Sequence, residues 1–226
     1  MEGPRRLARY TFLGFDPEAI VHSANNQTEV LNREKSERKI ETNANPLATL
    51  GGILPNDRGN QARERYTGGL VGYASYDLAS SFEKIPRNPR GRDEFPDMEF
   101  GLYLDGIVFD HYKNQVFYFY RNKNRIEDVR SIINDRPVNR EVFFGQPKPN
   151  LDHEKFCSKV GRAKEYIRSG DIFQVVISKR YKIPFKGSLV AFYKQLRRIN
   201  PSPYMYYLKF GQRQIVGSSP EMLARK

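Results

Sequence analysis

The stretch FGLYLDGIVFDHYKNQVFYFY (100–120) decides the fold class of this 226-residue chain. Two apolar runs, 102–110 and 115–120, flank a polar turn, and this pattern predicts an antiparallel hairpin. A second hairpin is expected over 204–217, with its turn at Gly211. Because strands outnumber helices and pair locally, the sequence predicts an α+β fold of antiparallel sheets with packed helices.

Other elements follow from the spacing of apolar residues. Residues 173–183 alternate between apolar and polar, which predicts a strand with Gln174 on its polar face. The polar segment 23–46 is expected to be an exposed excursion, with at most a brief strand near Ile40. The remaining predicted elements are a strand at 7–15, a buried strand followed by a helical turn within 68–83, and helices starting at Pro46 and over 156–167 and 189–199.

Composition excludes several classes of protein. The chain is 38% hydrophobic and 13% aromatic, which is enough for a core, and its single cysteine permits no intrachain disulfide and no cysteine-built zinc site. No apolar run approaches the roughly 18 residues of a membrane span. We therefore expect a cytoplasmic protein with no membrane partner.

The positive charge lies in the C-terminal third. Residues 1–150 carry 22 basic and 21 acidic side chains, whereas residues 151–226 carry 16 and 5. Such a segment could bind nucleic acid, face an anionic small molecule, or pair with an acidic surface of another polypeptide. The run FYFYRNKNR (117–125) is the best argument for nucleic acid, but no RNA-binding motif accompanies it.

Most candidate sites have a simpler structural interpretation. The three histidines are far apart in the sequence, which is typical of surface or turn residues and not of a zinc or catalytic site. The acidic stretch 93–99 lacks the spacing of a calcium loop and is expected to be a solvated loop. Gly68, Gly69 and Gly72 form GGxxG, not a dinucleotide fingerprint, and are expected to allow close backbone packing.

The segment NPSPYMYYLKFG (200–211) is harder to dismiss. Its two prolines fix the backbone just before an aromatic strand. The segment could be a rigid connector that packs its aromatic rings into the core. Alternatively, Tyr204, Met205 and Tyr206 could bind a flat apolar ligand by stacking and sulfur contacts. The cluster GSSPE (217–221) ends the second strand of the same hairpin, where a plain turn is the simpler interpretation.

Several motifs together resemble one enzyme family. YIRSGDIFQVVISKRY (166–181), LRRINPSPYMYYLKF (196–210) and IVGSSPEMLARK (215–226) closely resemble the large subunit, component I, of anthranilate synthase, a chorismate-utilising enzyme of tryptophan biosynthesis. RYTFLGFDPE (9–18), GGLVGYASYDLASSFE (68–83) and VFDH (108–111) match its N-terminal region in the same order. The resemblance implies an incomplete fold of this type, with its N-terminal region at 1–150 and the first part of the chorismate-binding domain at 151–226.

The resemblance also implies two functional sites. Gln174 occupies the position where water-using relatives place a lysine general base, and a neutral amide there suits an enzyme that uses ammonia. An amide hydrogen-bonded within a sheet is the structural alternative. The residues implied to bind the inhibitor L-tryptophan are Asn200, Pro201, Pro203, Tyr204, Met205 and Gly217, with Tyr206 standing where phenylalanine is usual.

Cofactors and partners follow from the same resemblance. The family makes anthranilate and pyruvate from chorismate and ammonia, with Mg²⁺ bound by motifs that are expected beyond Lys226 and ammonia from a glutamine amidotransferase subunit, component II. This chain alone is therefore expected to be inactive, and its basic segment to face an acidic surface supplied by another polypeptide. The alternatives are aminodeoxychorismate synthase component I, another chorismate-utilising relative, or a basic nucleic-acid-binding module.

Overall fold

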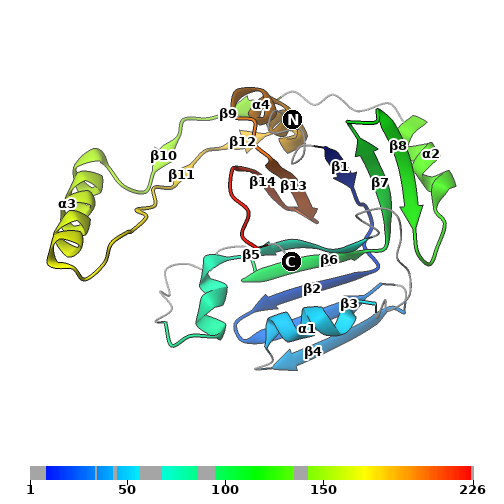
Figure 1. Ribbon diagram of the computed structural model, residues 1–226, viewed down its shortest axis with the longest axis horizontal. Coiled ribbons are helices and arrows are strands. Elements are labelled where there is room, and N and C mark those ends of the chain that lie inside the picture. Colours follow the sequence, from blue (N-terminus) through cyan, green and yellow to red (C-terminus); the bar gives the residue numbers. More distant parts are fainter. Residues whose placement is uncertain are drawn as a thin grey trace. The chain divides into compact units, whose positions relative to one another are not determined.

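The computed structural model describes residues 9–33, 35–42, 45–55, 68–85, 95–134 and 142–224, which form two compact units. Unit 1 comprises the described residues of Met1–Arg136 and Tyr193–Lys226, and unit 2 those of Pro137–Phe192. Helices are interspersed along the chain with strands that pair in antiparallel sheets, so the predicted α+β class is confirmed (Figure 1). None of the described helices combines the length and apolar character needed to cross a membrane.

A five-stranded antiparallel sheet forms the larger part of unit 1. Its strand order is β4-β3-β2-β6-β5, so β6 pairs with both β2 and β5. The strands are β2 (Ala19–Ala24), β3 (Gln27–Asn32), β4 (Glu37–Thr42), β5 (Gly69–Ala74) and β6 (Met98–Tyr103). The predicted close packing of glycines is confirmed at Gly72, where a Cβ atom would lie 2.1 Å from the backbone oxygen of Glu99.

The core of this sheet lies under the helix α1 (Pro46–Ile53) and the 3-10 helix Tyr76–Ser81. Asn45 caps α1 by accepting hydrogen bonds from the backbone N–H groups of Leu47 at 3.0 Å and Ala48 at 3.3 Å, and Pro46 fills the first turn. The buried residues that meet there are Val21, Leu50, Leu78 and Met98.

A three-stranded sheet, β1-β7-β8, forms the second part of unit 1. It contains β1 (Tyr10–Leu13), β7 (Asp105–Asp110) and β8 (Gln115–Tyr120), followed by α2 (Ile126–Asn134). The predicted hairpin at 100–120 is confirmed by the β7–β8 pairing, but its first apolar run spans the end of β6 and the whole of β7. One apolar run thus crosses from one sheet to the other.

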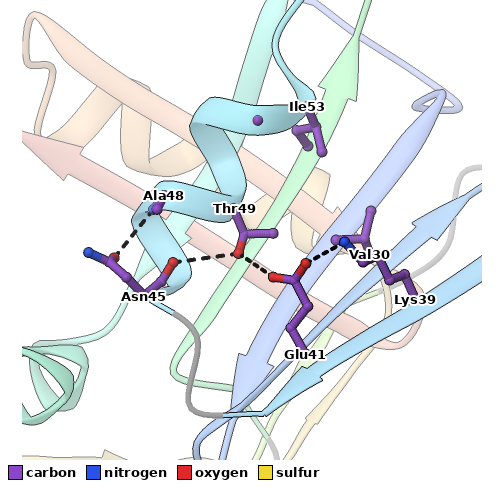
Figure 2. Close-up of a pocket in the computed structure, with 8 residues that line it drawn as sticks. Val30, Lys39, Glu41, Asn45, Ala48, Thr49 and Ile53 are labelled. Atoms are coloured by element: carbon purple, nitrogen blue, oxygen red, sulfur yellow. Dashed lines mark hydrogen bonds and ion pairs between the residues drawn. The ribbon is translucent and has the colours of Figure 1, made fainter.

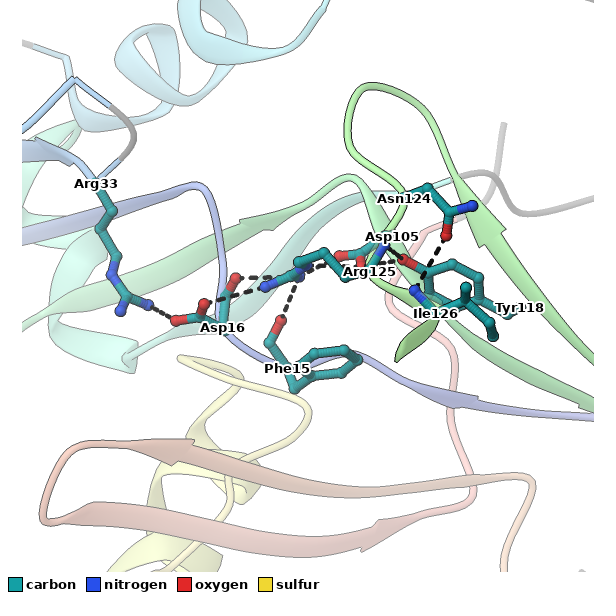
Figure 3. A network of polar contacts seen from close by, with 8 residues as sticks. All are labelled: Phe15, Asp16, Arg33, Asp105, Tyr118, Asn124, Arg125 and Ile126. Carbon is teal, nitrogen blue, oxygen red and sulfur yellow. Dashed lines mark hydrogen bonds and ion pairs between the residues drawn. The ribbon is translucent and has the colours of Figure 1, made fainter. Parts of the chain in front are cut away.

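Arg125 ties these two sheets together (Figure 3). Its Nε donates to Asp105 Oδ2 at 2.9 Å, and a second, very short contact joins Nη2 to Oδ1. Its Nη1 donates to Asp16 Oδ2 at 3.0 Å. Asp16 in turn forms an ion pair with Arg33, the residue that follows β3. Tyr118 donates to Asp105 at 2.7 Å, so the buried carboxylate is fully engaged.

The C-terminal hairpin completes unit 1. β13 (Tyr204–Phe210) pairs with β14 (Arg213–Ser219) through seven residue pairs. Its turn contains Gly211 with φ +58°, a conformation that glycine adopts without strain. The predicted hairpin and its turn are both confirmed.

Unit 2 contains two short ribbons and a long helix. β9 (Phe143–Phe144) pairs with β12 (Phe185–Lys186), and β10 (Lys148–Pro149) pairs with β11 (Tyr181–Lys182). α3 (His153–Ser169) starts at the cap Asp152 and ends at Gly170 with φ 82°. α4 (Leu189–Ile199) begins in unit 2 and ends in unit 1. The predicted helices at 156–167 and 189–199 are therefore confirmed.

Three predictions from the sequence are wrong. The segment 23–46 is not an excursion, because it contributes the end of β2 and all of β3 and β4; only the brief strand near Ile40 is confirmed. Residues 173–180 form no strand, although Arg180 exchanges hydrogen bonds with Asn150, and the short paired strand begins only at Tyr181–Lys182. Within the acidic stretch, Glu99 is 3% exposed in β6 and is not in a solvated loop, whereas 93–94 lie outside the described residues.

Candidate functional site

The hairpin β13–β14 brings two of the sequence motifs together. The cross-strand partners are Met205 with Ser218 and Tyr206 with Gly217, so NPSPYM and GSSPE lie side by side at one end of the hairpin. The prolines fix the backbone that leads from α4 into β13. Of the residues that the sequence singled out, this end of the hairpin unites Tyr204, Met205, Tyr206 and Gly217.

Two serines that were not predicted to be site residues, Ser202 and Ser218, connect the two motifs by hydrogen bonds. Ser218 Oγ donates to the backbone oxygen of Asn200 at 2.7 Å and lies 2.9 Å from Ser202 Oγ. Ser202 is 6% exposed and sits between the two prolines. These contacts place Asn200 and the Pro-Ser-Pro turn against β14. The only signal in the sequence was the occurrence of small hydroxyl residues next to proline in both motifs.

Gly217 allows Tyr206 to lie across β14. A Cβ atom at position 217 would lie 2.1 Å from Cζ and 2.3 Å from the hydroxyl oxygen of Tyr206. Any larger side chain at 217 must therefore displace this ring, which is itself 42% exposed. The glycine and the tyrosine form one surface at this end of the hairpin.

The turn end of the hairpin is anchored to the five-stranded sheet. Arg213 binds the buried carboxylate of Glu99 at 2.7 and 3.0 Å. Phe210 is buried, and its ring lies 6.3 Å from that of Tyr73 on β5. Burial, together with the charge of Glu99, raises the pKa of Tyr73 to about 12. The hairpin is thus held at both ends.

The chemistry at the motif end of the hairpin is that of binding. Because side chains alternate along a strand, Tyr204 and Tyr206 lie on one face of the hairpin, beside Gly217, and Met205 lies on the other face, beside Ser218. Aromatic faces and sulfur favour flat apolar groups, and the hydroxyls and carbonyls add hydrogen bonds. These side chains can bind and orient a ligand through such contacts.

Gln174 lies in unit 2 and is not part of the hairpin. It is exposed, in the irregular segment 173–180 that follows α3. The neighbouring apolar side chains Phe173 and Val176 are 95% and 81% exposed. The expected placement of Gln174 on the polar face of a strand is therefore wrong, because there is no strand at this position.

The structure offers no metal centre in the part of the chain it describes. No group of three or more histidine, cysteine, aspartate or glutamate side chains is placed there to hold an ion. His22 pairs with Glu29 at 2.9 Å, and His111 lies 2.8 Å from the hydroxyl of Thr11. His153 is at the start of α3, 3.6 Å from the sulfur of Cys157. The three histidines thus have separate partners.

Comparison with known proteins places the chain in a family. The family model described as chorismate binding enzyme matches residues 2–226. Anthranilate synthase component 1 of Methanothermobacter marburgensis is 41% identical over 225 residues, which cover 100% of this chain and 47% of the relative. The same component of Acetivibrio thermocellus is 36% identical over 250 residues, covering 100% and 50%.

A solved structure agrees with these relatives. The crystal structure of anthranilate synthase component I from Streptococcus pneumoniae TIGR4 superposes with a TM-score of 0.81 at 26% sequence identity, covering 98% of this chain and 52% of that one. The predicted anthranilate synthase-type fold is confirmed by this similarity. The chain spans about half the length of the curated relatives that it matches. Since the family model covers nearly every residue, this chain belongs to the chorismate binding enzyme family.

Proposed function

We propose that the chain is the N-terminal half of an anthranilate synthase component 1. The observation that carries this proposal is the 41% identity to such a component, which extends over the whole chain and therefore includes both hairpin motifs. The complete enzyme would combine chorismate with ammonia and release anthranilate, pyruvate and water. The predicted division at residue 150 would mark the start of its chorismate-binding domain.

Gln174 is proposed to act in the ammonia step. Its amide can donate and accept hydrogen bonds but cannot remove a proton from water. Ammonia is a better nucleophile than water and needs no such base, so a positioning amide is sufficient. The exposed position of Gln174 leaves its amide free to face a second polypeptide segment, which fits a site completed by the other half of the enzyme.

Feedback inhibition by L-tryptophan is proposed to use the hairpin. The Pro-Ser-Pro turn leads into the end of the hairpin that carries Tyr204, Met205 and Gly217, and an indole ring could contact either its aromatic face or its sulfur-bearing face. Gln174 is not part of this hairpin but lies in the irregular segment 173–180. The inhibitor would therefore act by shifting the population of enzyme conformations and not by blocking Gln174 directly.

The proposed enzyme has a partner and a metal ion. The designation component 1 of the relatives supports a second component, proposed to be a glutamine amidotransferase that delivers ammonia in the cytoplasm. Mg²⁺ is proposed for the complete enzyme. The described residues do not fit it, since they contain no suitable group of ligands, so no magnesium ligand is assigned to this chain.

The experiment is complementation between halves. The chain is assayed with chorismate, ammonium and Mg²⁺, alone and after co-expression with the C-terminal half of the Methanothermobacter marburgensis relative. Anthranilate fluorescence is expected only from the pair. Aminodeoxychorismate as the product of the pair would identify the sister enzyme instead. A stable pair that consumes no chorismate would overturn the proposal.

A further inference from the structure

A cavity of about 410 Å³ opens between α1 and the strands β3 and β4, and none of its lining residues belongs to the hairpin β13–β14 (Figure 2). The inner side of α1 packs on the sheet through Pro46 and Leu50, while its outer side is open. The cavity combines an apolar wall with a polar end. Its lining residues are Val30, Lys39, Glu41, Asn45, Ala48, Thr49, Gly52 and Ile53.

Gly52 keeps this cavity open. A Cβ atom at position 52 would meet no other atom within 4 Å, and the same is true of Gly51, which does not line the cavity. Neither glycine has a positive φ, so the backbone does not require glycine at either position. Glycine inside a helix is unfavourable relative to alanine. Gly52 therefore leaves open space beside the helix, which a larger side chain would fill.

The polar end of the cavity holds one negative and one positive group. Glu41 accepts hydrogen bonds from Lys39 Nζ at 2.6 Å and from the hydroxyl of Thr49 at 3.1 Å. Both contacts lower the pKa of Glu41, so its carboxylate is ionised at neutral pH. An ammonium group has three N–H donors and a carboxylate has about four acceptor positions. Lys39 and Glu41 therefore each retain capacity for a ligand.

We propose that this cavity binds a small zwitterion with an apolar substituent, of which an α-amino acid is the simplest. The Lys39–Glu41 ion pair exerts little net force on a ligand with a single charge, whereas a zwitterion can place its ammonium beside Glu41 and its carboxylate beside Lys39. A ligand carrying both charges satisfies both residues. Its apolar substituent would cover Val30, Ala48 and Ile53. This inference is independent of the proposed enzyme activity.

The test measures binding to the whole chain by isothermal titration calorimetry. The probes are L-leucine, L-phenylalanine and L-methionine, with isopentylamine and 4-methylpentanoate as leucine analogues that lack one charge. At least one amino acid should bind saturably, at least tenfold more tightly than either analogue. The absence of saturable binding by all three at 20 mM, or equal affinities for leucine and its analogues, would overturn the proposal.

Substitutions locate the site. Gly52→Leu fills the cavity and should weaken amino-acid binding at least tenfold, whereas the matched control Gly51→Leu should change it less than twofold. Circular dichroism confirms that both variants are folded. Glu41→Gln removes the negative charge without changing the shape, so it should weaken leucine binding and strengthen 4-methylpentanoate binding. Unchanged leucine affinity in Gly52→Leu and Glu41→Gln would place the ligand elsewhere and refute the inference.

Discussion

The guanidinium group of Arg213 on β14 donates two hydrogen bonds to the carboxylate of Glu99 on β6, Nε to Oε2 at 3.0 Å and Nη2 to Oε1 at 2.7 Å. The Glu99 side chain is 4% exposed and that of Arg213 is 36% exposed. A planar fork on a buried carboxylate fixes orientation as well as distance. This pair therefore determines how the hairpin lies on the five-stranded sheet.

Arg213→Gln is expected to lower the free energy of unfolding of the chain by about 2 kcal/mol, because Glu99 would stay buried without its cation. The value lies below that of a fully buried pair because solvent reaches Arg213. The double variant Glu99→Gln/Arg213→Gln should lose less than the sum of the single variants. Urea unfolding followed by circular dichroism measures all three losses, and strictly additive losses would show that the two residues do not interact.

This ion pair marks a limit of sequence analysis. Glu99 occurs in an acidic stretch that is typical of a solvated loop. Its burial follows from the position of β6 between β2 and β5, which are distant from each other in the sequence. The sequence does not predict β3, and predicts β4 only as a brief strand near Ile40, for a related reason: their polar side chains face solvent or pair across strands, as Arg38 does with Glu29, so few apolar residues mark them.

Tyr73 should make the stability of unit 1 depend on pH in the alkaline range. Its pKa is about 12 in the folded chain against an ordinary value of 10, since burial disfavours the phenolate. The unfolded chain loses this proton first, so the stability present below pH 10 declines between pH 10 and 12.

Tyr73→Phe should therefore reduce the fall in the free energy of unfolding over that interval. Denaturation at pH 9 and pH 11 measures the change. Tyr76→Phe, at a side chain that is 90% exposed, is the matched control and should behave as the unmodified chain does. Identical pH slopes for the two variants would refute the role of Tyr73.

Protonation of Asp110 should lower the free energy of unfolding of the chain at acidic pH. Arg9 donates three hydrogen bonds to its carboxylate, and the backbone N–H groups of Tyr112 and Lys113 donate two more. Led by the hydrogen bonding of Arg9, these contacts hold the pKa of Asp110 well below its ordinary value of 3.8. The stabilisation is present above about pH 4 and is lost as the pH falls below it.

Asp110→Asn should be less stable than the unmodified chain at pH 7, and its stability should fall less between pH 5 and pH 2.5. Urea midpoints at three pH values show this. Glu37→Gln, at an exposed carboxylate on β4, is the control and should preserve the original acid dependence. If Asp110→Asn retains it too, other carboxylates determine acid unfolding.

At the candidate site, the local pattern of apolar and polar residues correctly predicts the strand pairing. The two motifs of the hairpin, 200–205 and 217–221, are close in the sequence, and strand alternation with one glycine turn is enough to predict their pairing. By contrast, the alternation at 173–183 predicted a strand, although alternation alone cannot supply a hydrogen-bonding neighbour. Such a neighbour comes from tertiary structure, and among the described residues strand pairing begins only at β11, after residue 180.

The contact between Tyr206 and Gly217 leads to the last prediction. A methyl group at position 217 would overlap the outer end of the Tyr206 ring, which is free to turn toward solvent. Gly217→Ala should therefore swing the ring out and lower the free energy of unfolding by only about 1 kcal/mol, near the lower end of the cost of overpacking. Tyr206→Ala in the same chain should recover most of that loss.

Ring displacement can be followed by NMR of ¹³C-labelled tyrosine, assigned with Tyr206→Phe. If the hairpin binds tryptophan in the complete enzyme, Gly217→Ala should also raise the inhibitor concentration needed for half inhibition at least tenfold, while Tyr206→Phe, which keeps the ring, should change it less than threefold. The reason is that Gly217→Ala moves an aromatic face of the site, whereas Tyr206→Phe only removes a hydroxyl. Unshifted Tyr206 resonances in Gly217→Ala would refute the steric argument, and shifted resonances with unchanged inhibition would separate the hairpin from the regulatory site.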